Sequence, residues 1–144
     1  MNSTFVNEIM NKNVITVDKS SSLQETAISM KKSNVGCVII TDKSMPVGII
    51  TERDFVDVAA KGNPLFTDVH EVMSSPLITI DSEETVWEAS EMMKEKGIHK
   101  LPVTQNDQIV GMITTTDIVK ISSVGSDSEM RRICDQILLR MKDE

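Results

Sequence analysis

The chain is short of aromatic residues and of cysteine, and each shortage limits what it can be. Aromatic residues make up 3%, with no tyrosine and one tryptophan, so a core must consist of Ile, Val, Leu and Met. The two cysteines, Cys37 and Cys134, form no Cys-x-x-Cys pair and no disulfide framework. Two scattered histidines and two cysteines do not build a zinc site. We therefore expect neither a metal nor a resident cofactor.

Positive charge is also scarce: the chain has 15 Lys and Arg residues and 22 Asp and Glu residues, which gives a net charge of −7. This balance argues against a general surface for nucleic acid or anionic membrane. No apolar run reaches membrane-spanning length, and the first residues have neither a basic region nor an apolar one. The sequence thus predicts a soluble, cytoplasmic protein with a hydrophobic content of 40%, enough for a core.

The chain repeats itself. Displaced by 63 positions, residues 4–56 match residues 67–119 without a gap at 17 positions, far more than chance allows. Gly62-Asn63-Pro64 is the one clear linker. We therefore divide the chain into repeat 1 (1–62), repeat 2 (63–123) and a C-terminal amphipathic helix (124–144).

Each repeat predicts the order β-α-β-β-α. A short helical turn ends at Met10 or Met73, and strands 14–17 and 77–80 follow. Ser22 and Ser82 are the predicted helix N-caps, whereas Asn34 and Gly97 end the two helices. The predicted inner helix faces are Leu23, Ala27 and Met30 in repeat 1, and Val86, Ala89 and Met93 in repeat 2. Strands 37–41 and 101–104 lead through polar turns, at 42–44 and 105–107, to a last strand and helix. We expect an α/β (α+β) fold in which the two repeats pack with pseudo-twofold symmetry.

The most informative stretch occurs twice, as Gly48 to Asp54 and as Gly111 to Asp117. Each copy is a short apolar strand that ends at a threonine, with an aspartate three residues later. A strand that leads into a helix start exposes free amides and the positive end of the helix dipole. The aspartate can accept hydrogen bonds from both ribose hydroxyls. The same Thr-x-x-Asp spacing also forms a helix cap, so the motif has two interpretations.

The ungapped pair resembles a tandem of CBS domains, a Bateman module, over residues 5–122. The resemblance rests on the Val-Ile-Thr-Val strand after Met10, on Gly97 to Val103, and on the doubled Gly-apolar-apolar-Thr-x-x-Asp. It implies a stand-alone regulatory module that binds AMP, ADP, ATP or S-adenosylmethionine. It also implies a homodimer that signals to a regulated protein partner, which the sequence does not identify.

The resemblance assigns two pockets, each completed by the other repeat. One pocket would use Thr51, Arg53 and Asp54, completed by Ile98, His99 and Lys100, with Ile78 near the base. The other would use Thr114 and Asp117, completed by Val35, Gly36 and Cys37, with Ile15 near the base. Lys100 lacks the bidentate fork of arginine, and Gly36-Cys37 carries no cation, so phosphate should prefer the Asp54 pocket. His99 could equally be an interface histidine, Arg53 and Lys100 solvated charges, and Cys37 a small buried hydrophobe.

Two further features leave alternatives open. Met130, Ile133, Ile137 and Met141 recur at helical spacing after a capping box at Ser126 and Glu129. This tail either folds back on its own domain or makes a dimer or partner contact. The function is either a metabolite sensor or a constitutive scaffold with vestigial pockets. We do not expect an enzyme, because the sequence shows no nucleophile–base arrangement, metal-ligand spacing or Gly-rich phosphate loop.

Overall fold

The computed structural model describes residues 3–122, 132–133, 135–137 and 139. These residues form two compact units with three-stranded mixed sheets, which confirms the predicted α+β class. The continuous unit comprises residues 14–78, and the split unit combines residues 1–13 with residues 79–144. Among the described helices, none combines the length and the apolar character that a bilayer crossing needs.

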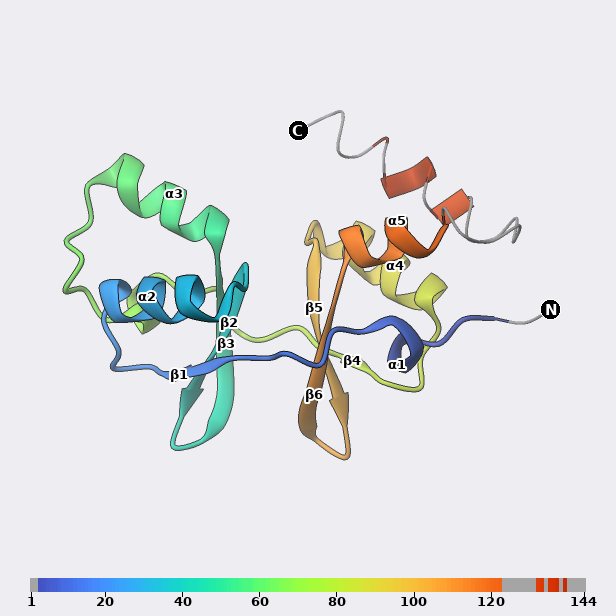
Figure 1. The fold of residues 1–144 in the computed structure, drawn as a ribbon, viewed down its shortest axis with the longest axis horizontal. Helices are drawn as coiled ribbons and strands as arrows, with labels where there is room; N and C mark the ends of the chain where they lie inside the picture. The colour runs from blue at the N-terminus through green and yellow to red at the C-terminus, as the bar shows by residue number, and fades with distance from the viewer. Residues whose placement is uncertain (1–2, 123–131, 134, 138, 140–144) are drawn as a thin grey trace. The chain divides into compact units, whose positions relative to one another are not determined.

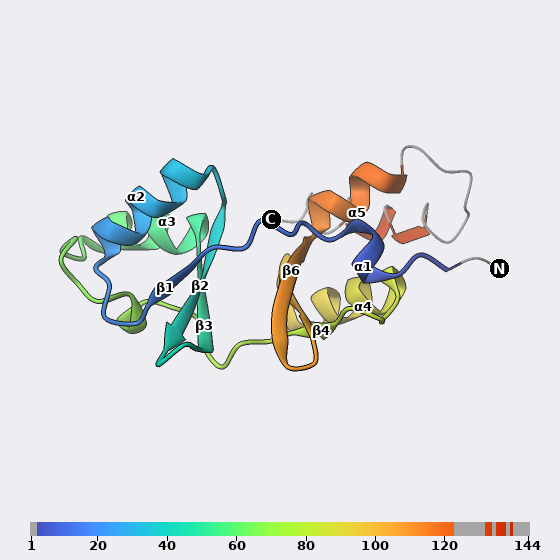
Figure 2. The same ribbon diagram turned by 60° about the horizontal axis from the view of Figure 1, so that its bottom comes forward.

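In the continuous unit, two helices cover the same face of the sheet (Figures 1 and 2). The sheet has the order β1-β2-β3, with β1 parallel to β2 and β2 antiparallel to β3. Buried Leu23 and Met30 of α2 and Val58 of α3 pack with Val38, Ile40 and Ile50 of the sheet. Its elements are β1 (Thr16–Asp18), α2 (Leu23–Ser33), β2 (Cys37–Asp42), β3 (Met45–Thr51), α3 (Glu52–Lys61) and the 3-10 turn η1 (Val69–Glu71).

The split unit repeats this arrangement with the sheet order β4-β5-β6. Val86, Ala89 and Met93 are all buried, which confirms the predicted inner face of the second repeat's helix. Its elements are α1 (Val6–Ile9), β4 (Ile80–Asp81), α4 (Val86–Lys96), β5 (Lys100–Gln105), β6 (Gln108–Thr114) and α5 (Thr115–Ser122).

The two repeats exchange their first segments. Asn11 exchanges two backbone hydrogen bonds of 2.8 Å with Met112 on β6, and Val6 is fully buried in the split unit. Ser74 likewise exchanges backbone hydrogen bonds with Ile49 on β3, and Val69 is buried in the continuous unit. Each repeat's opening turn therefore packs on the unit built mainly from the other repeat. Consequently, the boundaries between the two compact units lie at residues 13/14 and 78/79, whereas the boundary between the two sequence repeats lies after residue 62.

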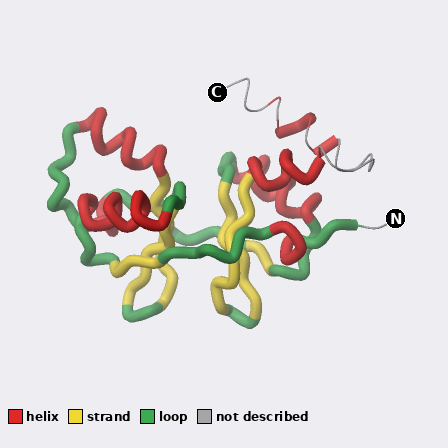
Figure 3. The backbone as a smooth tube through the Cα atoms, viewed as in Figure 1, coloured by secondary structure: helices red, strands yellow, loops and turns green. Residues whose placement is uncertain are grey.

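Local sequence explains how the elements begin and end. Ser22 caps α2 by accepting a 3.0 Å hydrogen bond from the Glu25 amide, as predicted. Asn34 and Gly97 close α2 and α4 in the left-handed region, with φ of 53° and 67°. Figure 3 shows the two hairpin loops, whose central residues all have positive φ, as the twist of paired strands requires: Lys43, Ser44, Asn106 and Asp107.

Three predictions need correction. The N-cap of α4 is Thr85 and not Ser82, because Thr85 accepts the Glu88 amide at 3.1 Å. Ser82 is buried. Its backbone amide donates to the Thr104 carbonyl, and its backbone carbonyl accepts from the Asn7 amide. On α2, Thr26 is fully buried and the predicted Ala27 is only half-buried; the Thr26 hydroxyl donates to the Ser22 carbonyl. The first strand of each repeat begins later than predicted, at Thr16 instead of residue 14 and at Ile80 instead of residue 77.

Only part of the predicted C-terminal helix belongs to the described structure. Ile133 and Ile137 are buried within the chain itself, in the split unit. The Arg132 guanidinium lies over the Trp87 ring of α4, 5.4 Å from its centroid. The predicted capping box at Ser126 and Glu129, with Met130 and Met141, lies outside the described residues.

Candidate functional site

The first candidate site is the start of α3. Thr51 ends β3 and serves as the N-cap of α3. One carboxylate oxygen of Asp54, Oδ2, accepts from the Thr51 amide at 2.8 Å and from the Thr51 hydroxyl at 3.3 Å. Neither bond uses Oδ1. Both residues are half-buried, so a carboxylate that caps the helix still has acceptor positions for a ligand.

The start of α5 repeats this arrangement with a different hydroxyl bond. The Asp117 carboxylate accepts from the Thr114 amide at 3.1 Å, and the Thr114 hydroxyl accepts from the Asp117 amide at 3.1 Å. This is a reciprocal capping box. The cap interpretation of both motifs is therefore confirmed. At each helix start, the cap hydrogen bonds hold one aspartate in a fixed position.

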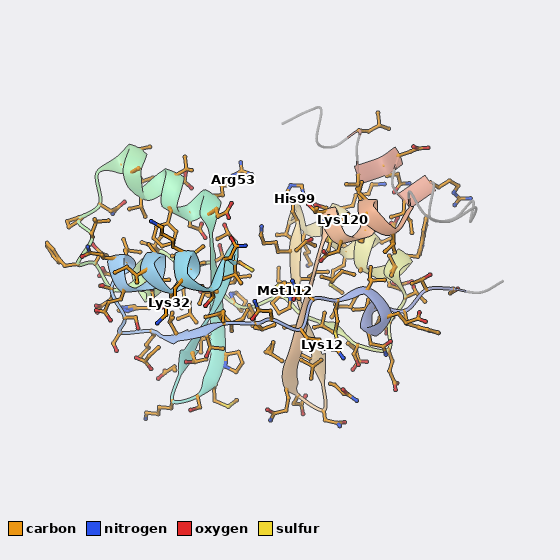
Figure 4. The ribbon with its side chains drawn as sticks, in the orientation of Figure 1. Lys12, Lys32, Arg53, His99, Met112 and Lys120 are labelled. Carbon is orange, nitrogen blue, oxygen red and sulfur yellow. The ribbon has the colours of Figure 1, made fainter. Side chains whose placement is uncertain are left out.

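The charge beside the two aspartates differs. Arg53, on the first turn of α3, is exposed, and the equivalent residue on α5 is the neutral Thr116. Figure 4 shows Arg53 at this end of α3. Because the first amides of each helix also favour negative charge, the α3 start is better suited to an anionic ligand.

The residues at the entry of the preceding strand lie beside each helix start. In the continuous unit, Cys37 pairs with Thr51, and the Gly36 carbonyl accepts from the Glu52 amide at 3.1 Å. In the split unit, Lys100 pairs with Thr114, and the His99 carbonyl accepts from the Thr115 amide at 3.0 Å. Each repeat thus brings its own strand entry to its own helix start.

The predicted apolar contacts are also available. Val35 and Ile98 follow the ends of α2 and α4 and are half-buried. Ile15 and Ile78 lie just before β1 and β4 and are half-buried too, and the Ile15 carbonyl accepts from Ile39 of β2 at 3.0 Å. Half-buried aliphatic side chains at strand entries suit a flat, apolar ring such as adenine.

The two predicted pockets each combine residues of both units. Thr51, Arg53, Asp54 and Ile78 belong to the continuous unit, as do Ile15, Val35, Gly36 and Cys37. Ile98, His99, Lys100, Thr114 and Asp117 belong to the split unit. The pairing of one repeat's helix start with the other repeat's strand entry therefore stays a prediction.

The CBS domain family matches residues 6–61 and 69–124, once for each repeat. The chain belongs to the CBS domain family. An uncharacterized protein of Methanopyrus kandleri is 37% identical over 125 residues, which are 84% of this chain and 64% of that protein. The CBS domain-containing protein YhcV of Bacillus subtilis is 29% identical, and the match covers 91% of this chain and 96% of that protein. This CBS pair thus spans less than two thirds of the Methanopyrus relative.

A solved CBS domain pair provides a structural comparison with bound ligands. The pair of protein MJ0100, in complex with 5′-methylthioadenosine and S-adenosyl-L-methionine, superposes with a TM-score of 0.77 at 28% identity. The match covers 85% of this chain and 98% of that one. Both of its ligands are adenosine derivatives.

One feature of the continuous unit escaped the sequence analysis. A cavity of about 180 Å³ in the continuous unit borders Asp54 and is lined by side chains of α3 and of the segment around η1. Its other lining residues are Asp57, Val58, Lys61, Asn63, Glu71 and Val72. The spacing of Asp54, Asp57 and Lys61 along one side of a helix was the available signal. Asp54 therefore lies where the helix start and this polar cavity meet.

Proposed function

We propose that this CBS pair is a regulatory module that binds adenosine-type ligands and passes the binding signal to a protein partner. The single observation that carries the proposal is the doubled helix start, where Thr51 holds Asp54 and Thr114 holds Asp117. Each aspartate is half-buried and fixed by its cap at the positive end of the helix dipole. A fixed carboxylate of this kind suits the two hydroxyls of a ribose.

The comparison with MJ0100 supports the adenosine part of the proposal, since that pair was solved with two adenosine derivatives. The charge difference supports a ranking of ligands. AMP and ADP should prefer the site with Asp54 and Arg53, whereas uncharged or cationic ligands should suit the site with Asp117. We further propose that the module is a homodimer, and that the ligand shifts the balance between two of its states.

Calorimetry with 5′-methylthioadenosine, S-adenosylmethionine, AMP and ATP tests the proposal. Replacing Asp54 by Ala should weaken AMP binding by roughly ten- to a hundredfold, since a hydrogen bond to a charged group contributes about 1.5–3 kcal/mol. Asp57→Ala is the matched control, because it removes the same charge from α3 one turn further on. Asp54→Asn keeps one acceptor oxygen for the cap, removes the charge and replaces the second carboxylate oxygen by an NH2 donor.

The outcomes separate the alternatives. Equal affinities in wild type, Asp54→Ala and Asp57→Ala would reject Asp54 as a ligand contact. Thermal melting gives the second readout, because a ligand at 100 times its Kd should add about 2.7 kcal/mol of stability. A chain whose melting temperature responds to none of the four ligands is a constitutive scaffold with vestigial pockets, and not a sensor.

A second experiment tests the pairing of strand entry with helix start. Lys100 is opposite Thr114 in its own unit, yet the resemblance assigns it to the ligand of Asp54. If the assignment is right, Lys100→Ala weakens the binding event that Asp54→Ala removes, and it lowers the affinity for AMP more than the affinity for adenosine. If Lys100→Ala instead weakens the event that Asp117→Ala removes, each repeat builds its own site.

A further inference from the structure

The polar cavity between α3 and the segment around η1 is small. Its volume is about 180 Å³, and it lies within the continuous unit. An engineered apolar cavity of about 150 Å³ accommodates benzene, whereas pockets for drug-sized ligands begin at about 300 Å³. The cavity therefore has room for a metabolite of a few carbon atoms and not for a nucleotide.

Two valines form the apolar side of this cavity. Val58 of α3 is buried in the core of the continuous unit, and the half-buried Val72 packs against the same core. The Val72 amide also donates to the carbonyl of Val69 at 3.0 Å, and Val69 is fully buried. Core packing on both sides therefore fixes η1 beside α3 and keeps the cavity in shape.

Charges of both signs surround the two valines. Asp57 and Lys61 lie one turn apart on α3, and Glu71 belongs to η1. Among the residues that the structure describes, none of these three side chains takes part in an ion pair or a hydrogen bond. The carboxylate of Asp54, at the edge of the cavity, is already held by the cap of α3. The cavity thus offers two carboxylates and one ammonium group that have no protein partner.

The second repeat does not carry the same charges. Displacement by 63 positions places Lys120 opposite Asp57. The same displacement places the neutral Val124 opposite Lys61. The carboxylate and the ammonium group on the helix are therefore a property of the first repeat, and the shared order of elements does not require them.

The two signs of charge restrict the ligand. A simple cation would meet the ammonium group of Lys61, and a simple anion would meet the carboxylates of Asp57 and Glu71. A zwitterion complements both signs, and a free α-amino acid carries its ammonium and carboxylate groups on one carbon atom. Asn63 adds an amide to the lining, which can donate to the carboxylate of such a ligand.

We propose that this cavity binds a free α-amino acid with a small aliphatic side chain. Glu71 and Asp57 hold the ammonium group of the ligand, Lys61 holds its carboxylate, and the aliphatic side chain packs on the two valines. Apart from Asp54, which borders both, the cavity shares no lining residue with the sites proposed for adenosine-type ligands. The inference therefore adds a second class of ligand and does not depend on the first.

An NMR titration of the full chain with L-valine tests the site. We expect saturable shifts centred on the amides of residues 57–63, 71 and 72, with a Kd of about 1 mM or below, as suits a ligand of so few atoms. Two probes with related carbon skeletons separate the charges, because isobutylamine lacks the carboxylate and isovalerate lacks the ammonium group. Both should bind about tenfold more weakly than L-valine, or weaker still.

Two variants that each remove one charge provide the second arm. Lys61→Gln should weaken L-valine binding by about tenfold or more and strengthen isobutylamine binding, because it removes a partner of the carboxylate and a repulsive charge for the cation. Glu71→Gln should weaken L-valine binding to a similar degree and strengthen isovalerate binding. A loss of fold would weaken every ligand, so the opposite signs identify direct contacts. Lys32→Gln and Glu52→Gln are the matched controls, since both residues are exposed and lie outside the cavity.

Three results would overturn the inference. One is the absence of saturable binding for both L-valine and L-alanine at tens of millimolar. Another is an equal loss of L-valine binding in the two control variants. The third is isobutylamine that binds as tightly as L-valine, which would make the cavity a site for organic cations. These titrations contain no nucleotide, so their failure leaves the proposed adenosine-type ligands untouched, and a chain that binds no adenosine derivative could still bind L-valine.

Discussion

A methyl group added at Gly48 should destabilise the continuous unit strongly. A Cβ at this position would lie 2.6 Å from Met73 Sδ and 2.8 Å from the Ser74 carbonyl oxygen. Ordinary contacts between such atoms need about 3.5 Å or more, so both neighbours must move by close to 1 Å. The methionine has flexible torsions. The carbonyl does not, because the Ser74 backbone is hydrogen-bonded in both directions to Ile49.

Gly111→Ala is the matched comparison in the split unit. Its Cβ would meet Met10 Sδ at 2.6 Å, but the nearest backbone oxygen, that of Asn11, lies at 3.1 Å. Overpacking costs about 1–3 kcal/mol, so we expect about 2–3 kcal/mol for Gly48→Ala and about 1–2 kcal/mol for Gly111→Ala. At about 3 °C per kcal/mol for a chain of this size, the melting temperature falls by roughly 6–9 °C and 3–6 °C.

Urea unfolding of both variants, alone and combined with Met73→Ala or Met10→Ala, tests the steric explanation. Removing the methionine should recover more stability beside Gly111 than beside Gly48, where the fixed carbonyl of Ser74 remains. The reasoning is wrong if Gly48→Ala costs less than about 0.5 kcal/mol. It is also wrong if Gly111→Ala is the more damaging of the two.

Three smaller effects can be measured on the same chain. Thr85→Ala should cost about 1 kcal/mol in urea unfolding, because the α4 amide of Glu88 loses its side-chain acceptor. Hydrogen bonds from the Ser20 hydroxyl and amide hold the pKa of Asp18 below its ordinary value of 3.8, so Ser20→Ala should raise that pKa in an NMR titration. Because the folded pKa is the lower one, this contribution to stability is present above pH 3.8 and disappears as the pH falls through the folded pKa, so the variant should also lose less stability on acidification. Arg132→Ala should lower the stability of the split unit by about 0.5–1 kcal/mol through the lost contact with Trp87, and Arg132→Lys should recover part of it, both in thermal melts.

Local chemistry explains why the order of elements was predictable from the sequence. Ser22 precedes an apolar stripe with an acid three residues on, and Asn34 and Gly97 tolerate positive φ, so helix limits are encoded nearby. The incorrect N-cap at Ser82 shows the limit of such signals. Its backbone is occupied by long-range hydrogen bonds, although the repeat alignment already places Thr85 opposite Ser22.

The composition of the compact units was not predictable in the same way. Thr4, Val6 and Met10 match Thr67, Val69 and Met73, so both opening segments suit either docking site. Which site each segment takes depends on chain connectivity and long-range packing, and no local pattern records it. For the candidate site, the sequence located the two aspartates and their caps, but the cavity beside Asp54 depends on how α3 packs near η1.

The exchange of opening segments has a consequence for synthesis on the ribosome. The segment with Val6 leaves the ribosome long before its native docking strand, β6, is made. Meanwhile the nascent continuous unit presents the equivalent site around Ile49, which Ser74 normally occupies. Since the two segments match at alternate positions, the early one is a ready competitor for that site. Correct folding of this duplicated chain therefore requires the later copy to displace, or outpace, the earlier one.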